Sequence, residues 1–585
     1  MPSEIPRPVG ENTGVRDDAS RIRTESLRCP FWRIPPPCVH YFAMRSSTGC
    51  ARLLCLTFVL LFSISVFASA YNGHPRLVVV IVIDQFRGDY LERYRDQFGD
   101  GGFRMFLDHG AYFPNCNYNY ANTRTAPGHS TLFTGAYSNG HGIVSNEWWD
   151  EKKKKMVTSV EDDSTKLVGV EGSQTGASPH NLLADTLGDE VKLATQGKAR
   201  VFGISLKDRA AVLPGGFAAD AAYWVEPKTG AFITSTYYRT DLPQWVQNFN
   251  STRPAKYWDR EWKDSQGVVL RSTAHRKRKD GTDAGFYEVI GSTSFANEYE
   301  IEFGKELIVY ENVGRGPATD LLAISLSAND ILGHQVGPDT PEMQQMALDL
   351  DHELADFFNF LGHQIGLANV WIVLSADHGV STLPDAVKKL RIPAANLGAG
   401  KMEEQINDAL AAKFSSGKKT NFIKLDYPMA WLDEDAFAEV NVREQAAEGA
   451  VGEALKKAGL RDFYTKSQLA TGTVPNTPLG RKYLNSYSPE GSWFVMAVPD
   501  IYTVGAATGT DHASPYNYDT HVPLAFYGLP FRTGTYRESV EPIDLVPTIA
   551  SLLGINPPTH SVGRVLTEAI APPYQASGNT REVQP

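Results

Sequence analysis

Cysteine is scarce in this chain. Five cysteines occur in 585 residues, and four of them lie within the first 55 positions. After residue 70 the chain keeps Cys116 alone, so no intrachain disulfide can form there. A chain of this length can bury a sufficient hydrophobic core without such links. The composition therefore excludes a small scaffold held together by disulfides.

An excess of basic residues is also missing. Asp and Glu number 67 against 56 Lys and Arg, which gives a formal net charge of −11 at pH 7. Binding to a phosphate backbone requires a basic face, so nucleic acid is not expected as the main partner. Hydrophobic residues make up 42% and charged residues 21% of the chain, which is typical of a globular protein.

The apolar run at 53–67 is too short for a membrane span. It has 15 residues, whereas a spanning helix needs about 20. Arginines precede it and Ala68-Ser69-Ala70 follows it, as in a secretory signal peptide. We predict a signal peptide at 44–70, a periplasmic or secreted protein and no membrane span after cleavage; an uncleaved membrane anchor is the alternative. Residues 1–43 are predicted to be untranslated or a disordered leader.

The sequence does contain a series of buried strand patterns. Continuous aliphatic runs are typical of strands covered on both faces, as in a parallel sheet. They lie at 77–83, 199–205, 321–326 and 370–376, with a shorter strand at 524–527. Helical patterns lie between them, at 87–109, 127–135, 341–360 and 544–553. This alternation predicts an α/β fold with a mostly parallel central sheet and helices on both faces.

The length allows either several domains or one large α/β domain with insertions. We predict one main domain over 71–570, followed by a tail at 571–585. Two stretches depart from its strand and helix pattern, at about 219–316 and 380–508. The first begins with an expected hairpin at 224–233 and continues without a helical period. We predict both stretches to be insertions that cap the core.

Acidic and histidine side chains follow several of the predicted strands. Asp84 ends the first strand, and Asp377-His378-Gly379 ends the strand at 370–376. Asp330 and His334 are four residues apart, so they converge if the segment is helical, and His512 lies in a later loop. Because parallel strands end at one edge of a sheet, these side chains can form one site. Each has an ordinary alternative, such as a helix cap or a salt-bridged loop carboxylate for Asp84.

The candidate ligands share one chemistry. They offer carboxylate oxygens and imidazole nitrogens but no thiolate, a set that suits Zn²⁺, with Mn²⁺ or Fe also possible. There are enough ligands for two ions. Two ions about 4 Å apart can clamp the attacking and leaving oxygens of a phosphoryl transfer.

The stretch from Thr123 to His129 combines Thr, Pro and Gly before an apolar run. Thr is a good helix N-cap and Pro is tolerated in the first turn, so we expect Thr125 at a helix N-terminus, which favours an anion. By itself this pattern is an ordinary capped helix. Beside a metal ion, however, the Thr125 hydroxyl would gain a lower pKa and become a nucleophile.

Three further side chains are candidates for binding an anion. Lys207 and Arg209 follow the strand at 199–205, and they offer a point charge and a bidentate fork. Asn146 can donate through its amide. The ordinary alternatives are a pair of surface cations and a turn residue.

Together these motifs resemble the alkaline phosphatase superfamily. The resemblance covers about 77–553, and its motifs follow in the order Asp84, Thr125-Ala126-Pro127-Gly128-His129, Asn146, Lys207-x-Arg209, Asp330-x-x-x-His334, Asp377-His378-Gly379 and His512. More closely, the chain is similar to the monomeric periplasmic alkaline phosphatases that share their core with type I phosphodiesterases and nucleotide pyrophosphatases. This implies an alkaline-phosphatase-like sandwich with cap insertions, and a monomer. The loop at His512 reads His-Ala-Ser, where many relatives have His-Gly.

The resemblance also implies a role for each residue. Thr125 would be the nucleophile, forming a phosphothreonine intermediate that water hydrolyses. The two zinc ions would have separate ligand sets: Asp84, Asp377 and His378 beside Thr125, and Asp330, His334 and His512. The phosphoryl oxygens would be bound by Asn146, Lys207 and Arg209. His521 would be hydrogen-bonded behind the ligands rather than bound to metal.

The cation pair bears on the class of substrate. A phosphate monoester carries about two negative charges near pH 7 and a diester one, so two cations favour the monoester. Diesterase relatives lack the pair. We therefore predict hydrolysis of small phosphate monoesters. The alternatives are a phosphodiesterase or nucleotide pyrophosphatase of the same superfamily, and a catalytically dead binding protein. The sulfatase branch is disfavoured because it needs Cys or Ser where Thr125 stands.

Overall fold

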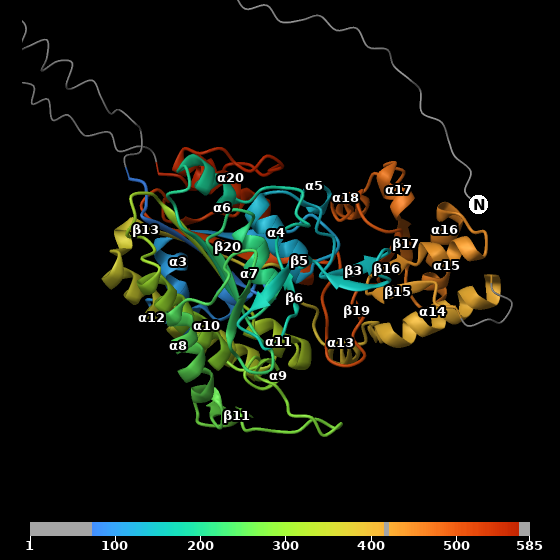
Figure 1. Cartoon of the computed structure of the whole chain (residues 1–585), viewed down its shortest axis with the longest axis horizontal. Coiled ribbons are helices and arrows are strands. Elements are labelled where there is room, and N and C mark those ends of the chain that lie inside the picture. The colour runs from blue at the N-terminus through green and yellow to red at the C-terminus, as the bar shows by residue number, and fades with distance from the viewer. Residues whose placement is uncertain (1–72, 415–419, 572–585) are drawn as a thin grey trace, which may run out of the picture. The chain divides into compact units, whose positions relative to one another are not determined.

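The computed structural model describes residues 73–414 and 420–571 (Figure 1). The predicted leader, the predicted signal peptide and residues 572–585 of the predicted tail lie outside these ranges. Within them, no helix combines the length and the apolar character that crossing a membrane requires. Cys116 is buried as a free thiol.

A sheet of eleven strands forms the centre, in the order β21-β2-β20-β13-β1-β12-β7-β8-β9-β5-β6. Its middle consists of five parallel strands: β13 (Val370–Ser375), β1 (Leu77–Ile83), β12 (Asp320–Leu326), β7 (Val201–Ser205) and β8 (Ala221–Val225). Every residue of these strands is buried, as expected of aliphatic runs covered on both faces. Four of the five coincide with predicted strands.

Antiparallel strands extend this sheet on both sides. Beyond β13 lie β20 (His521–Tyr527), β2 (Ala111–Asn117) and, paired parallel with β2, the short edge strand β21 (Gly534–Thr535). Beyond β8 lie β9 (Phe232–Ser235), β5 (Glu161–Val168) and β6 (Thr175–Ala177). The predicted α/β class with a parallel centre is confirmed.

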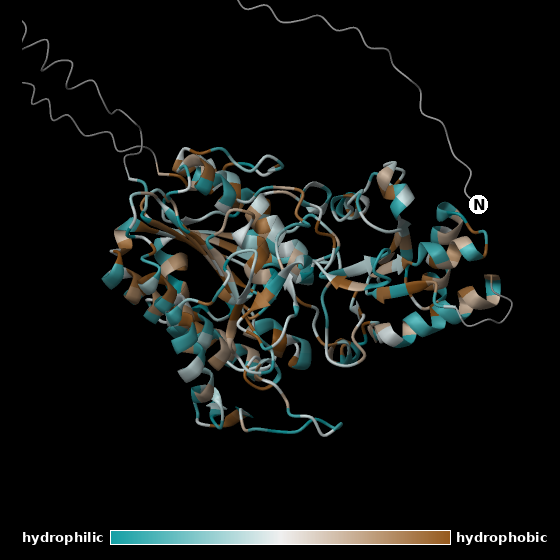
Figure 2. Ribbon diagram, in the orientation of Figure 1, coloured by the Kyte–Doolittle hydropathy of each residue, from teal (hydrophilic) through white to brown (hydrophobic). Residues whose placement is uncertain are grey.

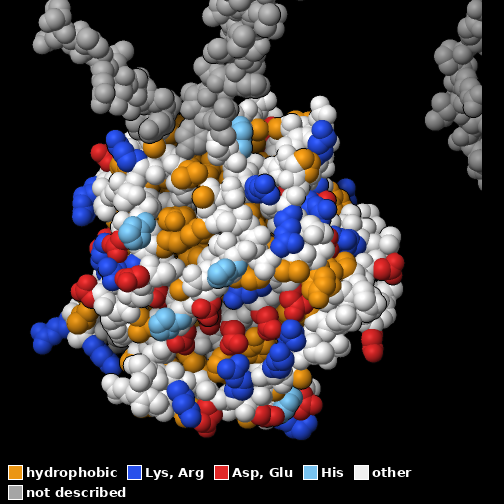
Figure 3. All heavy atoms as spheres, turned by 90° about the vertical axis from the view of Figure 1, so that its left-hand side faces the viewer, with side chains coloured by type: hydrophobic (Ala, Val, Ile, Leu, Met, Phe, Trp, Pro, Cys, Tyr) orange, Lys and Arg blue, Asp and Glu red, His pale blue; other side chains and the backbone are white. Residues whose placement is uncertain are grey.

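Helices cover both faces of the sheet (Figure 1). One layer contains α3 (Phe103–His109), α10 (Phe295–Tyr310) and α12 (Pro341–Gln364), and the other contains α4 (Thr125–Thr134), α6 (Leu187–Ala194), α7 (Asp208–Gly215) and α20 (Leu545–Leu553). Figure 2 shows apolar residues concentrated in the strands between these layers. On the face drawn in Figure 3, basic and acidic side chains are interspersed rather than gathered by sign.

The predicted helix at 87–109 is wrong. The segment contains α2 (Tyr90–Arg93), the short 3-10 helix η1 (Arg95–Gln97) and α3, with an irregular turn before α3. Glycines in this turn disfavour a continuous helix. The carboxylate of Asp351 instead accepts hydrogen bonds from the N–H groups of Gly99, at 2.7 Å, and Phe103, at 2.6 Å. A buried tertiary contact therefore fixes the turn.

Part of the first predicted insertion belongs to the core. The expected hairpin at 224–233 is formed by β8 and β9, which both belong to the central sheet, and α10 packs on β7 and β12. The remaining elements of 219–316 lie outside the sheet: α8 (Gln244–Thr252), η2 (Pro254–Tyr257), β10 (Glu261–Lys263), β11 (Val269–Ser272) and α9 (Phe286–Val289).

The second predicted insertion contains a separate sheet. Its four antiparallel strands are β15 (Ile423–Asp426), β16 (Met429–Leu432), β18 (Phe494–Val498) and β17 (Asp462–Thr465). They are accompanied by α14 (Ala399–Phe414), α15 (Glu434–Glu439), α16 (Glu444–Lys457), α17 (Lys466–Ala470) and α18 (Pro478–Asn485). Buried residues such as Phe422, Phe437, Val451 and Val495 give this unit a hydrophobic core of its own.

Short elements complete the described chain. They are α5 (Ser138–His141), β3 (Glu147–Asp150), β4 (Lys155–Thr158), α11 (Ala328–Val336), η3 (Leu367–Asn369), α13 (Pro384–Lys389), β14 (Ala395–Asn396), β19 (Thr503–Val504), α19 (Asn517–Thr520), η4 (Pro542–Asp544) and η5 (Thr567–Ala569).

Candidate active site

The polar residues that follow the parallel strands meet at one edge of the sheet. Asp84 follows β1, Lys207 comes shortly after β7, and Asp377 comes shortly after β13. Asp330 lies on α11, which begins directly after β12. Because these strands are parallel neighbours, their carboxyl ends bring together side chains that are distant in the sequence.

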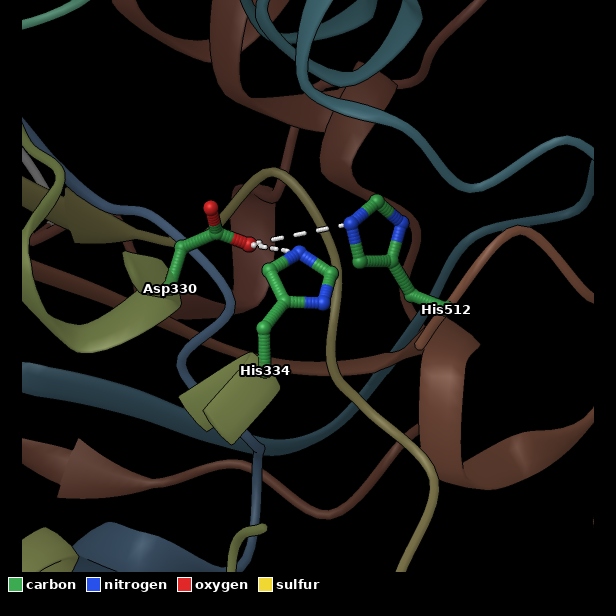
Figure 4. A group of neighbouring side chains, drawn as sticks. All are labelled: Asp330, His334 and His512. Atoms are coloured by element: carbon green, nitrogen blue, oxygen red, sulfur yellow. Dashed lines mark ion pairs between the residues drawn. The ribbon is translucent and has the colours of Figure 1, made fainter. Parts of the chain in front are cut away.

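Asp330, His334 and His512 form one group of donor atoms (Figure 4). Asp330 and His334 are one turn apart on α11, as their spacing predicts. Asp330 Oδ1 lies 3.1 Å from His334 Nε2 and 3.6 Å from His512 Nε2. The Nδ1 atom of His334 is bonded to the carbonyl of Thr510 at 3.0 Å, and that of His512 to the carbonyl of Thr123 at 2.6 Å. These bonds turn both Nε2 atoms toward Asp330, an arrangement typical of histidine ligands.

Asp84, Asp377 and His378 form a second group. His378 Nε2 lies 3.6 Å from Asp84 Oδ1 and 3.4 Å from Asp377 Oδ2. All three residues are fully buried, and these three atoms have no hydrogen-bond partner among residues 73–414 and 420–571. Ligands arranged tetrahedrally around Zn²⁺ at about 2.1 Å are about 3.4 Å apart. Both the spacing and the unpaired atoms therefore fit a bound cation.

The two groups are neighbours, since the rings of His378 and His512 stack with 3.7 Å between their centroids. Lys207 lies between them. Its Nζ is 2.6 Å from Asp84 Oδ2 and 2.6 Å from Asp330 Oδ2. Burial alone would lower the pKa of Lys207, but the two carboxylates outweigh burial and raise it.

The buried ionisable groups of the site shift one another's pKa values. Burial raises the pKa of Asp84 well above its usual range, and the nearby carboxylates of Asp330 and Asp377 raise it further. Burial also lowers the pKa of His378 and of His512, which keeps both rings neutral and able to act as ligands. Burial would lower the pKa of His334, but the carboxylate of Asp330 outweighs burial and raises it to about 9. Three buried carboxyl groups therefore lie beside two basic side chains, and a bound cation would favour the ionised form of all three.

Thr125 is buried at the start of α4, and its Oγ1 lies 3.4 Å from Lys207 Nζ. The N-cap position is occupied by Arg124, whose side chain does not cap the helix. Instead, Asn146 Oδ1 accepts a hydrogen bond from the Ala126 N–H at 2.8 Å. This bond directs Oδ1 to the helix and leaves the Asn146 amide nitrogen as a donor. Thr125 and Asn146 are thus joined at a helix N-terminus.

Arg209 lies on α7, and its side chain is 24% exposed. Its Nη1 is 3.5 Å from Asp208 Oδ1, and its Nε has no hydrogen-bond partner in the described part of the chain. Lys207, Arg209 and Tyr287 share the lining of a cavity of about 290 Å³. Tyr287 comes from α9, so the first predicted insertion forms part of this wall.

Gln85 connects the two groups, although it was not among the residues predicted for the site. Its backbone N–H donates to Asp377 Oδ1 at 3.0 Å, and its Nε2 donates to Asp330 Oδ1 at 2.7 Å. Its φ of 64° is uncommon for a residue with a side chain. Such strain is typical of functional sites, and the position directly after Asp84 was the only signal in the sequence.

His129 and Gly128 of α4 also contact the site. His129 Nδ1 lies 2.8 Å from the carbonyl oxygen of Thr125 and 3.3 Å from Asp377 Oδ2, and its Nε2 lies 2.7 Å from Ser325 Oγ. A Cβ at position 128 would lie 2.4 Å from the backbone oxygen of Asp377. Glycine is therefore required there for α4 to approach the end of β13.

The loop that carries His512 adopts a strained conformation. Ala513 has a φ of 73°, in the left-handed region that favours glycine. The Ala513 N–H donates to the carbonyl of Thr123 at 3.1 Å, and Asp519 accepts from the Ser514 N–H at 3.0 Å. His521 Nε2 is bonded to the carbonyl of Pro114 at 2.7 Å.

Known proteins are similar to this chain in sequence and in fold. The family model of type I phosphodiesterase / nucleotide pyrophosphatase matches residues 78–476. Alkaline phosphatase PhoV from Synechococcus elongatus is 33% identical over 89% of this chain and 99% of its own length. Alkaline phosphatase PafA from Elizabethkingia meningoseptica is 31% identical over 85% of this chain and 94% of its own length.

Crystal structures of PafA extend this similarity to the fold. The wild-type structure has a TM-score of 0.77 with 31% identity, and it covers 86% of this chain and all of that one. A second structure is of a PafA variant with substitutions at a threonine, an asparagine, a lysine and an arginine. The match in sequence and fold over most of the chain confirms the predicted superfamily: the chain belongs to the type I phosphodiesterase / nucleotide pyrophosphatase family of the alkaline phosphatase superfamily.

Proposed function

We propose that this chain is an exported alkaline phosphatase that hydrolyses small phosphate monoesters through a phosphothreonine intermediate, with two zinc ions as cofactors. The observation that carries the proposal is the placement of Thr125 and Lys207 beside two adjacent groups of metal-ligand type. The alkaline phosphatases PhoV and PafA support the same activity.

The donor atoms suit zinc. Each group combines imidazole nitrogen with carboxylate oxygen, a set that Zn²⁺ prefers. Asp330, His334 and His512 would hold one ion, and Asp84, Asp377 and His378 the other. Zinc at these positions would supply positive charge that lowers the pKa of the Thr125 hydroxyl and of a water molecule.

Thr125 would be the nucleophile. Its hydroxyl oxygen would attack phosphorus, the bond from phosphorus to the ester oxygen would break, and the alcohol would leave. Water would then attack the phosphothreonine and release inorganic phosphate, which restores Thr125. The overall reaction consumes one water and yields one alcohol and one phosphate.

Three side chains would bind the phosphoryl oxygens. The amide nitrogen of Asn146 is free to donate because its oxygen is bonded to Ala126. Lys207 Nζ lies close to Thr125 Oγ1, and Arg209 is only weakly held by Asp208. The PafA variant supports these assignments, since the same four residue types are substituted there and one residue separates its lysine from its arginine, as Asp208 separates Lys207 from Arg209.

The activity test compares two esters. The chain from residue 71 onward, loaded with zinc, should hydrolyse p-nitrophenyl phosphate with a kcat/KM at least about 100-fold above that for bis(p-nitrophenyl) phosphate, because two cations favour a dianion. A strong preference for the diester would establish the alternative, a phosphodiesterase or nucleotide pyrophosphatase. That alternative is favoured by the description of the matching family.

The remaining alternative is a binding protein without catalysis. It would be established if the zinc-loaded chain hydrolysed no phosphate ester and Thr125→Ala changed nothing. Export and a monomeric state are part of the proposal. N-terminal sequencing of the secreted protein should begin at Tyr71, and sedimentation should give the mass of one chain.

A further inference from the structure

The carboxylate of Asp426 is one of the contacts between the second predicted insertion and the candidate active site. Asp426 is the last residue of β15, and its Oδ1 lies 3.2 Å from Arg124 Nη2. Its Oδ2 accepts a hydrogen bond from Ser145 Oγ at 2.5 Å. The side chains of Arg124 and Asp426 are 12% and 18% exposed, so water only partly screens their attraction.

Both partners of Asp426 directly precede a residue with a proposed catalytic role. Arg124 precedes Thr125, and Ser145 precedes Asn146. Asn146 in turn accepts from the N–H of Ala126, the residue after Thr125. The contacts therefore form a closed ring of the Asp426 carboxylate, the start of α4 and the segment at 145–146.

The ring holds the N-cap of α4 in place. Arg124 is the N-cap residue, with extended backbone angles, and its carbonyl accepts the first helical hydrogen bond, from Gly128 at 2.9 Å. A change in the position of Arg124 would therefore move Thr125 along with the helix start. Asp426 itself is fixed by pairing with Met429 across β15 and β16.

We propose that Asp426 is a positioning residue that sets the distance between Thr125 and Asn146, and that the second insertion thereby contributes to catalysis. The inference rests on the proposed phosphatase function. A displacement of reacting groups by about 1 Å can cost about 100-fold in rate, and loss of a residue that orients a ligand typically costs about 10-fold to 100-fold. We therefore expect effects in this range.

The test uses three variants of the zinc-loaded chain and p-nitrophenyl phosphate. Asp426→Ala should lower kcat/KM by about 10-fold to 100-fold. Asp426→Asn should lose less, because its amide oxygen can still accept from one partner. The matched control is Glu403→Ala: Glu403 binds Lys424 at 3.0 Å and the Leu425 N–H at 2.8 Å on the same strand, without contact to Arg124 or Ser145. It should keep kcat/KM within about twofold of the wild type.

A second background separates positioning from general stability. If Asp426 acts through Asn146, then Asp426→Ala should cost less than about threefold when Asn146 is already replaced by Ala. The affinity for inorganic phosphate, measured as a competitive inhibition constant, should fall together with kcat/KM. If Asp426→Ala does not fold, Ser145→Ala removes one contact of the same ring, and it must show the same loss and the same dependence on Asn146.

Two results would overturn the inference alone. The first is an active wild-type chain whose Asp426 and Ser145 variants keep kcat/KM within twofold of the wild type. The second is an Asp426→Ala substitution that lowers kcat/KM by the same factor in the Asn146→Ala variant as in the wild type. A wild-type chain that hydrolyses no phosphate ester overturns the proposed function, and this inference with it.

Discussion

Replacing Arg209 with Ala should lower activity toward monoesters far more than toward diesters. A monoester dianion places one more negative charge near the guanidinium group than a diester does. At 4 Å and an effective dielectric constant of about 20, that extra charge is worth about 4 kcal/mol. The side chain is 24% exposed, and screening reduces this value, so we expect about 2 kcal/mol, or about 30-fold.

The prediction is measured as a ratio. kcat/KM for p-nitrophenyl phosphate, divided by kcat/KM for bis(p-nitrophenyl) phosphate, should fall by about 30-fold in Arg209→Ala. Arg239→Ala is the control, because Arg239 is similarly exposed at 26% and pairs with Glu311 at 3.2 Å. It should leave the ratio unchanged. Equal losses for both esters in Arg209→Ala would refute the proposed role of Arg209 in recognising the dianion.

Four further predictions concern the nucleophile, the metal, Gln85 and pH. Thr125→Ala should lower kcat by about 10³-fold or more and abolish acid-stable labelling by a ³²P-monoester; persistent labelling would exclude Thr125 as nucleophile. Zinc at about 100 times its Kd should stabilise the chain by about 2.7 kcal/mol, seen as a rise in Tm that magnesium does not produce; no rise would argue against the metal sites. Gln85→Leu should weaken zinc binding by about 10-fold to 100-fold in chelator competition, because it removes the hydrogen bond that orients Asp330. An unchanged affinity would show that this bond does not contribute to zinc binding. Burial lowers the pKa of His141 to about 3. Between pH 6.5 and pH 3 the unfolded chain therefore binds a proton that the folded chain does not, so the free energy of unfolding decreases as the pH is lowered. When the pH is lowered from 6.5 to 4, the free energy of unfolding, measured in urea with chelator present, should decrease by about 3 kcal/mol less in His141→Asn than in the wild type. An equal decrease in both proteins would contradict this.

The parallel strands could be predicted because their sequence pattern depends on local chemistry. A strand buried on both faces needs apolar residues at every position, and Leu77–Ile83 meets this requirement at each residue. The same reasoning placed Asp84 at the sheet edge. The spacing of Asp330 and His334 likewise predicted a shared helical face, because helical geometry fixes which residues are neighbours.

The contacts of Gln85, Asp351 and Asp426 could not be predicted in this way. Each depends on a partner more than 200 residues away in the sequence, so no local pattern marks it. Asp351 shows the consequence, since its carboxylate fixes the turn that interrupts the predicted helix at 87–109. The extent of the first insertion was missed for a similar reason: β8 and β9 are core strands because of their sheet partners.

The position of Lys207 explains how the site can keep its shape before metal binds and still bind an anion afterwards. Asp84 and Asp330 each divide their two oxygens between different partners. Each uses Oδ2 to bind Lys207, while Oδ1 faces His378 in one group and His334 and His512 in the other. The ammonium group therefore limits repulsion between the carboxylates without occupying the atoms that face the imidazoles. Cations at both groups would take up the negative charge that holds Lys207, and its Nζ, 3.4 Å from Thr125 Oγ1, would then be free to bind the phosphoryl group that Thr125 attacks.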